Sequence, residues 1–235
     1  HAGYQDAGQR DTHGAGGEWR VERQRLAWEI LEGWREAAAQ AGMPRTDDFN
    51  RGDNGGSGFF EVNQRRGVRW SATKAFLRPA MKRPNLKVVT GAEVKRLRME
   101  GKRAMGVEFW HDGETHFVST RIETVLAAGA IGSPQILQCS GIGPAGLVCE
   151  HGIPLVHALP GVGENLQDHL QLRTAFKVKG ARTLNEWAGS PFVKAQMALE
   201  YLFFRTGPLT MAPSPLGPLA QPAPHPQPAT PPHHL

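Results

Sequence analysis

The chain has 235 residues, and its 27 lysines and arginines against 22 aspartates and glutamates give a formal net charge of +5. With 40% hydrophobic and 21% charged residues it has the composition of a globular protein, which excludes a disordered or fibrous chain. No apolar run approaches the roughly 20 residues of a membrane-spanning helix, so the sequence predicts no transmembrane segment. The chain starts at His1 without a charged and apolar leader, so we expect a removed leader or a start inside a larger gene product.

The cysteines and basic residues indicate an ordinary cytoplasmic protein. Cys139 and Cys149 form neither a C-x-x-C pair nor a dense framework, so we expect no zinc site and two reduced, half-buried thiols. The isoelectric point is near 9.5, and basic residues cluster at positions 65–66 and 82–83. Because acidic residues are scattered elsewhere and no aromatic recognition motif accompanies the clusters, we interpret them as solvated surface and predict no nucleic-acid partner.

The first third of the chain alternates loops with short elements. Residues 1–17 are rich in glycine and polar side chains and are predicted to form a loop. Apolar residues recur at four-residue spacing over 18–41, which predicts a helix. The Asp-, Asn- and Gly-rich residues 45–58 indicate a second loop, which lacks the closing glutamate of a calcium site. A short strand is expected at 59–62, and a short helix at 71–81 after a basic loop.

The next stretch predicts a run of strands. Short alternating or apolar segments at 86–90, 93–99, 105–110 and 115–119 indicate strands, the last three forming a meander joined by tight turns. The apolar segment 123–129 lacks alternation, which is typical of a strand covered on both faces in a parallel sheet.

A helix is expected directly after that apolar segment. Ser133 stands where an N-cap belongs, Pro134 occupies the first helical position, and Gly141 and Gly143 end the helix. A buried strand followed by a tight small-residue turn and a helix N-terminus suits a dinucleotide, because unpaired N–H groups point beyond the strand end. Other α/β proteins share such turns, so this feature alone leaves cofactor binding open.

The last part of the chain changes character after Thr210. Strands are predicted at 153–157 and 172–178, and an amphipathic helix at 191–204. Asp168 and His169 are adjacent in an extended stretch and would point to opposite faces, so we interpret them as structural rather than as a catalytic dyad. The final 25 residues hold nine of the 18 prolines and almost no large apolar side chain, which predicts a disordered tail.

Four stretches of the chain carry motifs in a recognisable order. They are 13–17 (HGAGG), 85–94 with 106–108, 128–144 (AGAIGSPQILQCSGIGP) and 160–169 (PGVGENLQDH). Together they resemble the glucose–methanol–choline (GMC) flavin oxidoreductases, and 128–144 is similar to the second signature of that family. The resemblance covers roughly residues 10–210 and is nearest to choline and alcohol dehydrogenases.

The resemblance implies an enzyme that oxidises an alcohol by passing hydride to the N5 atom of FAD. The fold class implied is α/β with mixed α+β character: a partial Rossmann-like FAD-binding domain with a β-meander, and the start of an antiparallel-sheet substrate domain. We expect a partial FAD domain over 1–170, the start of the substrate domain over 171–210, and the Pro/His-rich tail over 211–235.

Four residues match cofactor-binding positions of the family. Val94 matches the valine whose main chain holds the adenine edge of FAD, while Ala128 and Gly129 match small residues beside the cofactor. Ser133 starts the adjoining helix. Asn165 and Asp168 match a further family stretch to which no contact is assigned. The resemblance assigns no catalytic residue and no metal ligand to this chain.

The chain also departs from the family pattern. Its first strand with the G-x-G-x-x-G turn and its C-terminal catalytic histidine have no match here, and family similarity ends near Ser214, which suggests a truncation or a frameshift. We therefore expect that the isolated chain neither binds FAD tightly nor oxidises alcohols, and that its exposed apolar surface favours aggregation.

Other function classes agree less well with the sequence. A catalytically dead remnant or interaction module that keeps part of the fold is the alternative. A hydrolase is excluded by the absence of a G-x-S-x-G elbow, and a nicotinamide-dependent Rossmann enzyme is disfavoured without its first βαβ unit. The alcohol, the electron acceptor and the oligomeric state are left open by the sequence.

Overall fold

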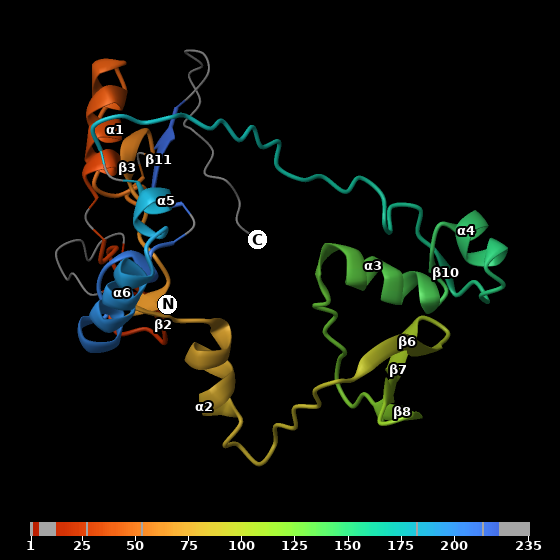
Figure 1. Cartoon of the computed structure of the whole chain (residues 1–235). Helices are drawn as coiled ribbons and strands as arrows, with labels where there is room; N and C mark the ends of the chain where they lie inside the picture. Colours follow the sequence, from red (N-terminus) through yellow and green to blue (C-terminus); the bar gives the residue numbers. More distant parts are fainter. Residues whose placement is uncertain are drawn as a thin grey trace. The chain divides into compact units, whose positions relative to one another are not determined.

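The computed structural model describes residues 2–4, 13–26, 28–52, 54–181, 183–212 and 214–220 (Figure 1). It divides the chain into two units, residues 1–86 with 175–235 and residues 87–174. Within the described residues, no helix is both long and apolar enough to cross a membrane. The predicted mixture of helices and antiparallel sheets is confirmed, while the functional domain limits at 170 and 210 stay a prediction.

The first unit opens with two short parallel strands, β1 (Ala2–Tyr4) and β2 (Trp19–Val21), which correct the predicted loop over 1–17 and the predicted helix start at Glu18. The helix itself, α1, spans Glu29–Gln40. Glutamates in its first turn favour this start because they complement the positive end of the helix dipole. The early strand was missed because it depends on pairing with a distant segment rather than on its own periodicity.

Two pieces of irregular sequence then form ordered structure. Strands β4 (Gln64–Arg65) and β5 (Val68–Arg69) make a hairpin where a basic loop was predicted. The predicted helix at 71–81 is confirmed as a π-helical turn, η2 (Thr73–Leu77), that continues into α2 (Arg78–Ala80). Phe76 of η2 stacks on Trp19 with ring centroids 5.9 Å apart, which ties this helix to β2.

The C-terminal part of the chain returns to this same unit. Helix α6 (Pro191–Phe204) is confirmed at its predicted limits and follows a short helix, α5 (Leu184–Trp187). A 3₁₀ turn, η3 (Pro208–Thr210), comes after it. No strand forms at 172–178, where one was predicted.

The prediction of a disordered tail over 211–235 is wrong for residues 216–219, which form a strand. Strand β11 (Leu216–Leu219) pairs antiparallel with β3 (Gly56–Phe59) (Figure 1). Gln24 Nε2 donates hydrogen bonds to the carbonyls of Pro215 and Phe60. Pairing with a distant strand orders this proline-rich segment, although its composition alone predicted no structure. Residues 221–235 lie outside the described residues.

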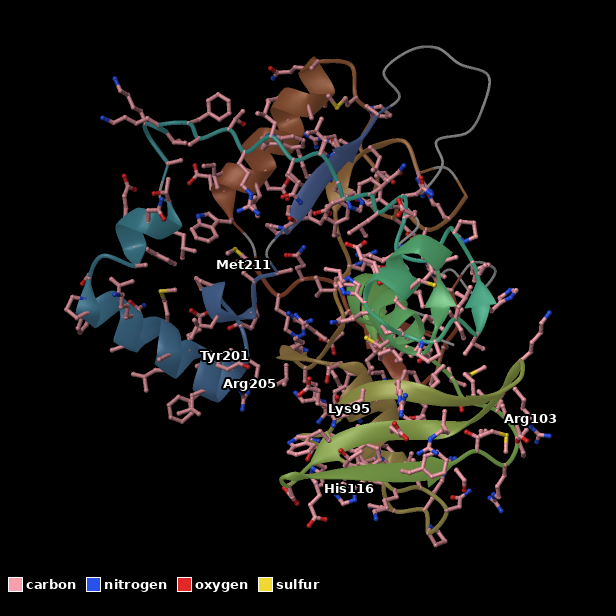
Figure 2. The ribbon with its side chains drawn as sticks, turned by 90° about the vertical axis from the view of Figure 1, so that its right-hand side faces the viewer. Lys95, Arg103, His116, Tyr201, Arg205 and Met211 are labelled. Carbon is pink, nitrogen blue, oxygen red and sulfur yellow. The ribbon has the colours of Figure 1, made fainter. Side chains whose placement is uncertain are left out.

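The second unit begins with the predicted meander. Strands β6 (Glu93–Glu100), β7 (Arg103–His111) and β8 (Glu114–Ser119) form an antiparallel sheet in sequence order (Figure 2). Asp112 and Gly113 both have positive φ angles in the β7–β8 turn, the conformation that two-residue hairpins favour. The strand predicted at 86–90 does not form, and those residues are exposed.

The rest of this unit contains two helices and a pair of short strands. Helix α3 (Gly129–Cys139) leads through β9 (Ile142–Gly143) to α4 (Ala145–Glu150), and β10 (His157–Ala158) pairs parallel with β9. The strand predicted at 123–129 is wrong, because residues 121–128 have no strand partner among the described residues and Val125 is 79% exposed. A parallel strand pairs with segments that are distant along the chain, and the local sequence does not show whether such partners are present.

Candidate functional site

The candidate site begins at the N-terminus of α3. The helix starts at Gly129, four residues earlier than Ser133, so Pro134 lies inside the helix rather than at its first position. Ala128 is the N-cap, and its N–H donates to Ser133 Oγ across 3.0 Å. Ser133 therefore does stabilise the helix start, but from inside the first turns instead of from the capping position.

Space is open above this helix start. Gly129 has a φ of +83°, a conformation that L side chains rarely adopt, and an added Cβ would meet nothing within 4 Å. Ala128, Gly129 and Ala130 are exposed, and Ile131 is 73% exposed. The first N–H groups of α3 thus face open space, together with the positive end of the helix dipole.

Val94 lies in the same unit, at the start of β6, opposite Phe109 of β7. A register shift between Val94 and Arg96 interrupts the ladder there. A bulge of this kind leaves the main chain of one residue outside the strand pairing, here Lys95, the neighbour of Val94.

Helix α3 is fixed to β6 by one side chain. Buried Ser140, just after the helix, accepts a hydrogen bond from Leu97 N–H at 2.8 Å and donates to the Ile136 carbonyl at 2.5 Å. Leu97 and Ile136 are buried as well. The contact covers an edge of the sheet and sets the position of α3 along the strand that carries Val94.

A cavity of about 710 Å³ is lined by α3 and the loop 161–167. Ser133 is one of its lining residues, while Val94, Ala128 and Gly129 are not among them. Gln138 Nε2 donates to the Val162 carbonyl at 3.0 Å, and a Cβ on Gly163 would lie 2.7 Å from the same nitrogen. Glycine at 163 therefore allows the loop to approach the helix closely.

Asp168 and His169 lie outside this cavity and are mostly exposed, with 3.9 Å between Asp168 Oδ1 and His169 Nδ1. Asp168 instead accepts a hydrogen bond from the His169 main-chain N–H at 2.7 Å. The two residues make a local turn contact and lack the side-chain hydrogen bond of a catalytic dyad. This agrees with the interpretation of Asp168 and His169 as structural residues.

The meander carries a buried carboxylate with a perturbed pKa. Glu108 accepts hydrogen bonds from Arg96 at 2.6 Å and Arg98 at 2.7 Å, and these bonds hold the pKa of its carboxyl below its usual range against the opposing effect of burial. Arg96 is the cross-strand partner of Glu108. The ionised pair fastens β6 to β7, so we interpret it as structural.

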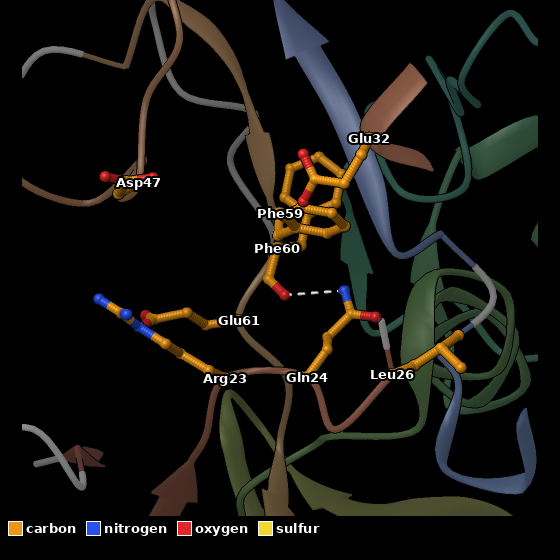
Figure 3. Close-up of a pocket in the computed structure, with 8 residues that line it drawn as sticks. All are labelled: Arg23, Gln24, Leu26, Glu32, Asp47, Phe59, Phe60 and Glu61. Atoms are coloured by element: carbon orange, nitrogen blue, oxygen red, sulfur yellow. Dashed lines mark hydrogen bonds between the residues drawn. The ribbon is translucent and has the colours of Figure 1, made fainter. Parts of the chain in front are cut away.

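The first unit holds a smaller cavity of about 200 Å³ (Figure 3). Gln24, which donates hydrogen bonds to the Phe60 and Pro215 carbonyls, is one of its lining residues. Two of its lining carboxylates, Glu32 and Asp47, form ion pairs with Arg35 at 3.4 and 3.5 Å. Arg35 therefore holds both of these carboxylates at one side of the cavity.

Next to it, three side chains could together hold a cation. His13 Nε2 lies 2.6 Å from Asp48 Oδ2, both side chains are buried, and a Glu61 oxygen lies within 4.8 Å of both. Asp48 also accepts the Asn50 N–H at 2.8 Å. This cluster was missed by sequence reasoning because its members lie 35 and 13 residues apart and no spacing rule joins them; the only signal was the position of His13 in a family motif.

The chain is similar to a known protein family and to individual members of it. A profile of the family described as GMC oxidoreductase matches residues 17–171. The oxygen-dependent choline dehydrogenase of Brucella ovis is 41% identical over 200 residues, which cover 85% of this chain and 36% of that protein. The mitochondrial choline dehydrogenase of Homo sapiens is 41% identical over 194 residues, 83% of this chain and 32% of that one. The chain thus spans about a third of the length of these relatives.

Solved structures agree with this result. An FAD-dependent oxidoreductase from Chaetomium thermophilum matches 89% of this chain and 39% of its own, with a TM-score of 0.76 and 25% identity. Pyridoxine 4-oxidase from "Mesorbium loti" matches 68% of this chain and 31% of its own, with a TM-score of 0.62 and 30% identity.

Proposed function

Because this chain belongs to the GMC oxidoreductase family, we propose that it forms the nucleotide end of an FAD site in an enzyme that oxidises the CH–OH group of a small alcohol. FAD would accept hydride when bound. The protein residues bind and orient the cofactor: Val94 through its main chain, Ala128 and Gly129 by leaving room, and Ser133 by holding the helix start. No catalytic residue is assigned within the chain.

The observation that carries this proposal is the open N-terminus of α3. Its small residues leave space for a ligand, and its free N–H groups favour the negative charge of a pyrophosphate. The bulge after Val94 leaves the main chain of the adjacent Lys95 outside the strand pairing, in the same unit as α3, and unpaired main-chain groups of this kind can recognise an adenine edge. The residues therefore fit the cofactor that the family implies.

The substrate class rests on the named relatives. Two of them are choline dehydrogenases, so we propose a small alcohol of this kind. We also propose a cytoplasmic location, supported by Cys139 and Cys149, which form no disulfide; both are exposed, not half-buried as predicted. The limits 1–170, 171–210 and 211–235 are proposed as functional divisions of the longer family fold.

Titration with FAD, followed by flavin fluorescence, tests the cofactor site in the chain as it stands. We expect weak, saturable binding, no flavin retained through purification, and no alcohol-dependent dye reduction. Gly129→Val should abolish the binding, because its side chain enters the open space. Gly113→Val is a matched control, since Gly113 has the same φ of +83° and equally open surroundings but lies in the β7–β8 turn.

Two outcomes would contradict the proposal: FAD binding that Gly129→Val leaves unchanged, or equal loss in both variants. Retention of FAD through purification would instead overturn the expectation that the isolated chain binds it only weakly.

A second candidate function is an interaction module that retains part of the fold. It is favoured by the exposed segment 121–128, where Ile122 is 91% and Val125 79% exposed without a strand partner among the described residues. Sequencing the flanking DNA separates the two: reading frames for the glycine motif and the terminal histidine favour the enzyme.

A further inference from the structure

Five basic side chains gather around one groove in the unit formed by residues 1–86 and 175–235. The groove has a volume of about 550 Å³, and the chain segments that line it are the β4–β5 hairpin, the helix at 72–80 and the end of α6. Its basic lining residues are Arg65, Arg66, Lys74, Arg78 and Arg205, with Val68 and Trp70 beside them. No carboxylate lines the groove.

None of the five side chains forms an ion pair in the described part of the chain, and the one carboxylate that contacts this cluster, Glu22, accepts the main-chain N–H of Arg66 at 2.5 Å. The arginines that do form ion pairs there are Arg25, Arg35, Arg45, Arg96 and Arg98. Lys74 Nζ donates to the Arg69 carbonyl at 2.8 Å, and Arg65 stacks over the Trp70 ring at 5.0 Å. Neither contact neutralises charge, so the five cations repel one another unless an anion is bound.

Two of the arginines occupy backbone positions that do not favour them. Arg66 and Arg205 have φ angles of +52° and +56°, and they are two of the four non-glycine residues with positive φ in the described residues. The other two are Asp112 and Asn165, the residue types that tolerate this conformation best. Glycine would suit both turns better, which indicates that the arginine side chains serve a purpose other than folding.

The fold holds these two arginines close together. Gly67 follows Arg66 in the hairpin turn, and a Cβ on Gly67 would lie 2.4 Å from the Arg205 carbonyl oxygen. Arg205 caps α6 and its guanidinium lies 4.7 Å from the centre of the Tyr201 ring (Figure 2). The hairpin turn therefore packs directly against the end of α6, and the groove is built by this contact.

We propose that this groove, which we name the basic groove, binds a ligand carrying two or more phosphate groups. Guanidinium groups bind phosphate oxygens through paired hydrogen bonds, and several of them arranged around one groove match a multiply charged anion better than a single ion. The phosphates could belong to a soluble compound or to a lipid headgroup, and the experiment distinguishes these sources.

The test measures binding of sodium tripolyphosphate to the whole chain by calorimetry at low salt, and sedimentation with phosphatidylcholine vesicles with and without phosphatidylinositol bisphosphate. Saturable binding of tripolyphosphate alone supports a soluble ligand, and binding to the phosphoinositide vesicles supports a headgroup. Binding to neither overturns the proposal.

The variant Arg66→Gly/Arg205→Gly separates function from folding. We expect about tenfold weaker anion binding, from the loss of charge-assisted hydrogen bonds, with an equal or higher melting temperature, because glycine relieves both backbone conformations. The control Lys82→Gln/Arg83→Gln removes the same charge from exposed positions outside the groove and should weaken binding less than about twofold. Equal weakening by both variants would show diffuse attraction and overturn the proposal.

The basic groove and the proposed cofactor site lie in different units of the chain, so variants can separate them. Gly129 lies in the unit formed by residues 87–174, so Gly129→Val should leave tripolyphosphate binding unchanged. If that variant weakened anion binding as much as the arginine variant does, the assignment to the basic groove would be wrong.

Discussion

The meander β6–β8 and the segment 121–128 have similar strand-forming sequences, yet only the meander forms strands. In the meander, each strand finds its partner a few residues away, across turns at Gly101 and Gly113. The segment 121–128 is just as apolar but has no strand partner among the described residues, and most of its residues are exposed. Strand propensity becomes a strand only where a hydrogen-bonding neighbour is within reach.

The largest expected effect follows from breaking the meander at Gly106. An added Cβ there would lie 2.2 Å from the Val118 carbonyl oxygen and 2.7 Å from the Phe117 ring. We expect Gly106→Ala to lower the free energy of unfolding by about 3 kcal/mol, because backbone atoms cannot move aside within the paired sheet. Urea denaturation followed by circular dichroism measures this loss.

Gly101→Ala is the matched control for this change. Gly101 lies in the β6–β7 turn with a φ of +53°, and nothing lies within 4 Å of its Cβ position. Only conformational strain of about 1 kcal/mol is expected. Equal losses for the two variants would mean that close packing at Gly106 does not support the sheet.

The next effect concerns the attachment of α3 to the sheet. Ser140→Ala removes the acceptor of the Leu97 N–H, which is then buried without a partner at the edge of β6. A loss of about 2 kcal/mol is expected, the usual cost of an unsatisfied buried donor. Amide hydrogen exchange should show faster exchange at Leu97, and unchanged exchange there would contradict the role of this hydroxyl.

A smaller, pH-dependent effect is expected at Glu108. Because Arg96 and Arg98 lower the pKa of this carboxyl in the folded state, its contribution is present above the unfolded value near 4.3 and is lost as the pH falls through the folded value. Glu108→Gln should cost about 1 kcal/mol at pH 7, since both arginines are half exposed. The difference from the unchanged chain should vanish at acidic pH, as thermal melts across pH would show. A difference that persisted at low pH would exclude this ion pair as its cause.

Local patterns explain which parts of the fold the sequence could predict. The meander and α6 were predicted because alternation, turns and helical periodicity lie within each segment. Strands β2 and β11 were missed because their order comes from partners far along the chain, β1 and β3 respectively.

The candidate sites likewise include residues that the sequence could predict and residues that it could not. The family motif led to Gly129 and Ser133, and the structure shows the first in open space and the second within the helix. The groove at Arg66 and Arg205 could not be predicted, because 139 residues separate the two arginines and only the contact at Gly67 brings them together.

The smallest effect on stability is expected in the segment 121–128. Val125→Asp should change the free energy of unfolding by less than about 0.5 kcal/mol, because the Val125 side chain is already 79% exposed. Solubility should nevertheless rise, since a charge in an unpaired, apolar segment opposes association between strands of separate chains. Gel filtration across protein concentrations tests this, with Val118→Asp, at an exposed but paired position of β8, as control. If both variants lose stability equally, the segment packs like the sheet, and the contrast between a paired and an unpaired strand sequence fails.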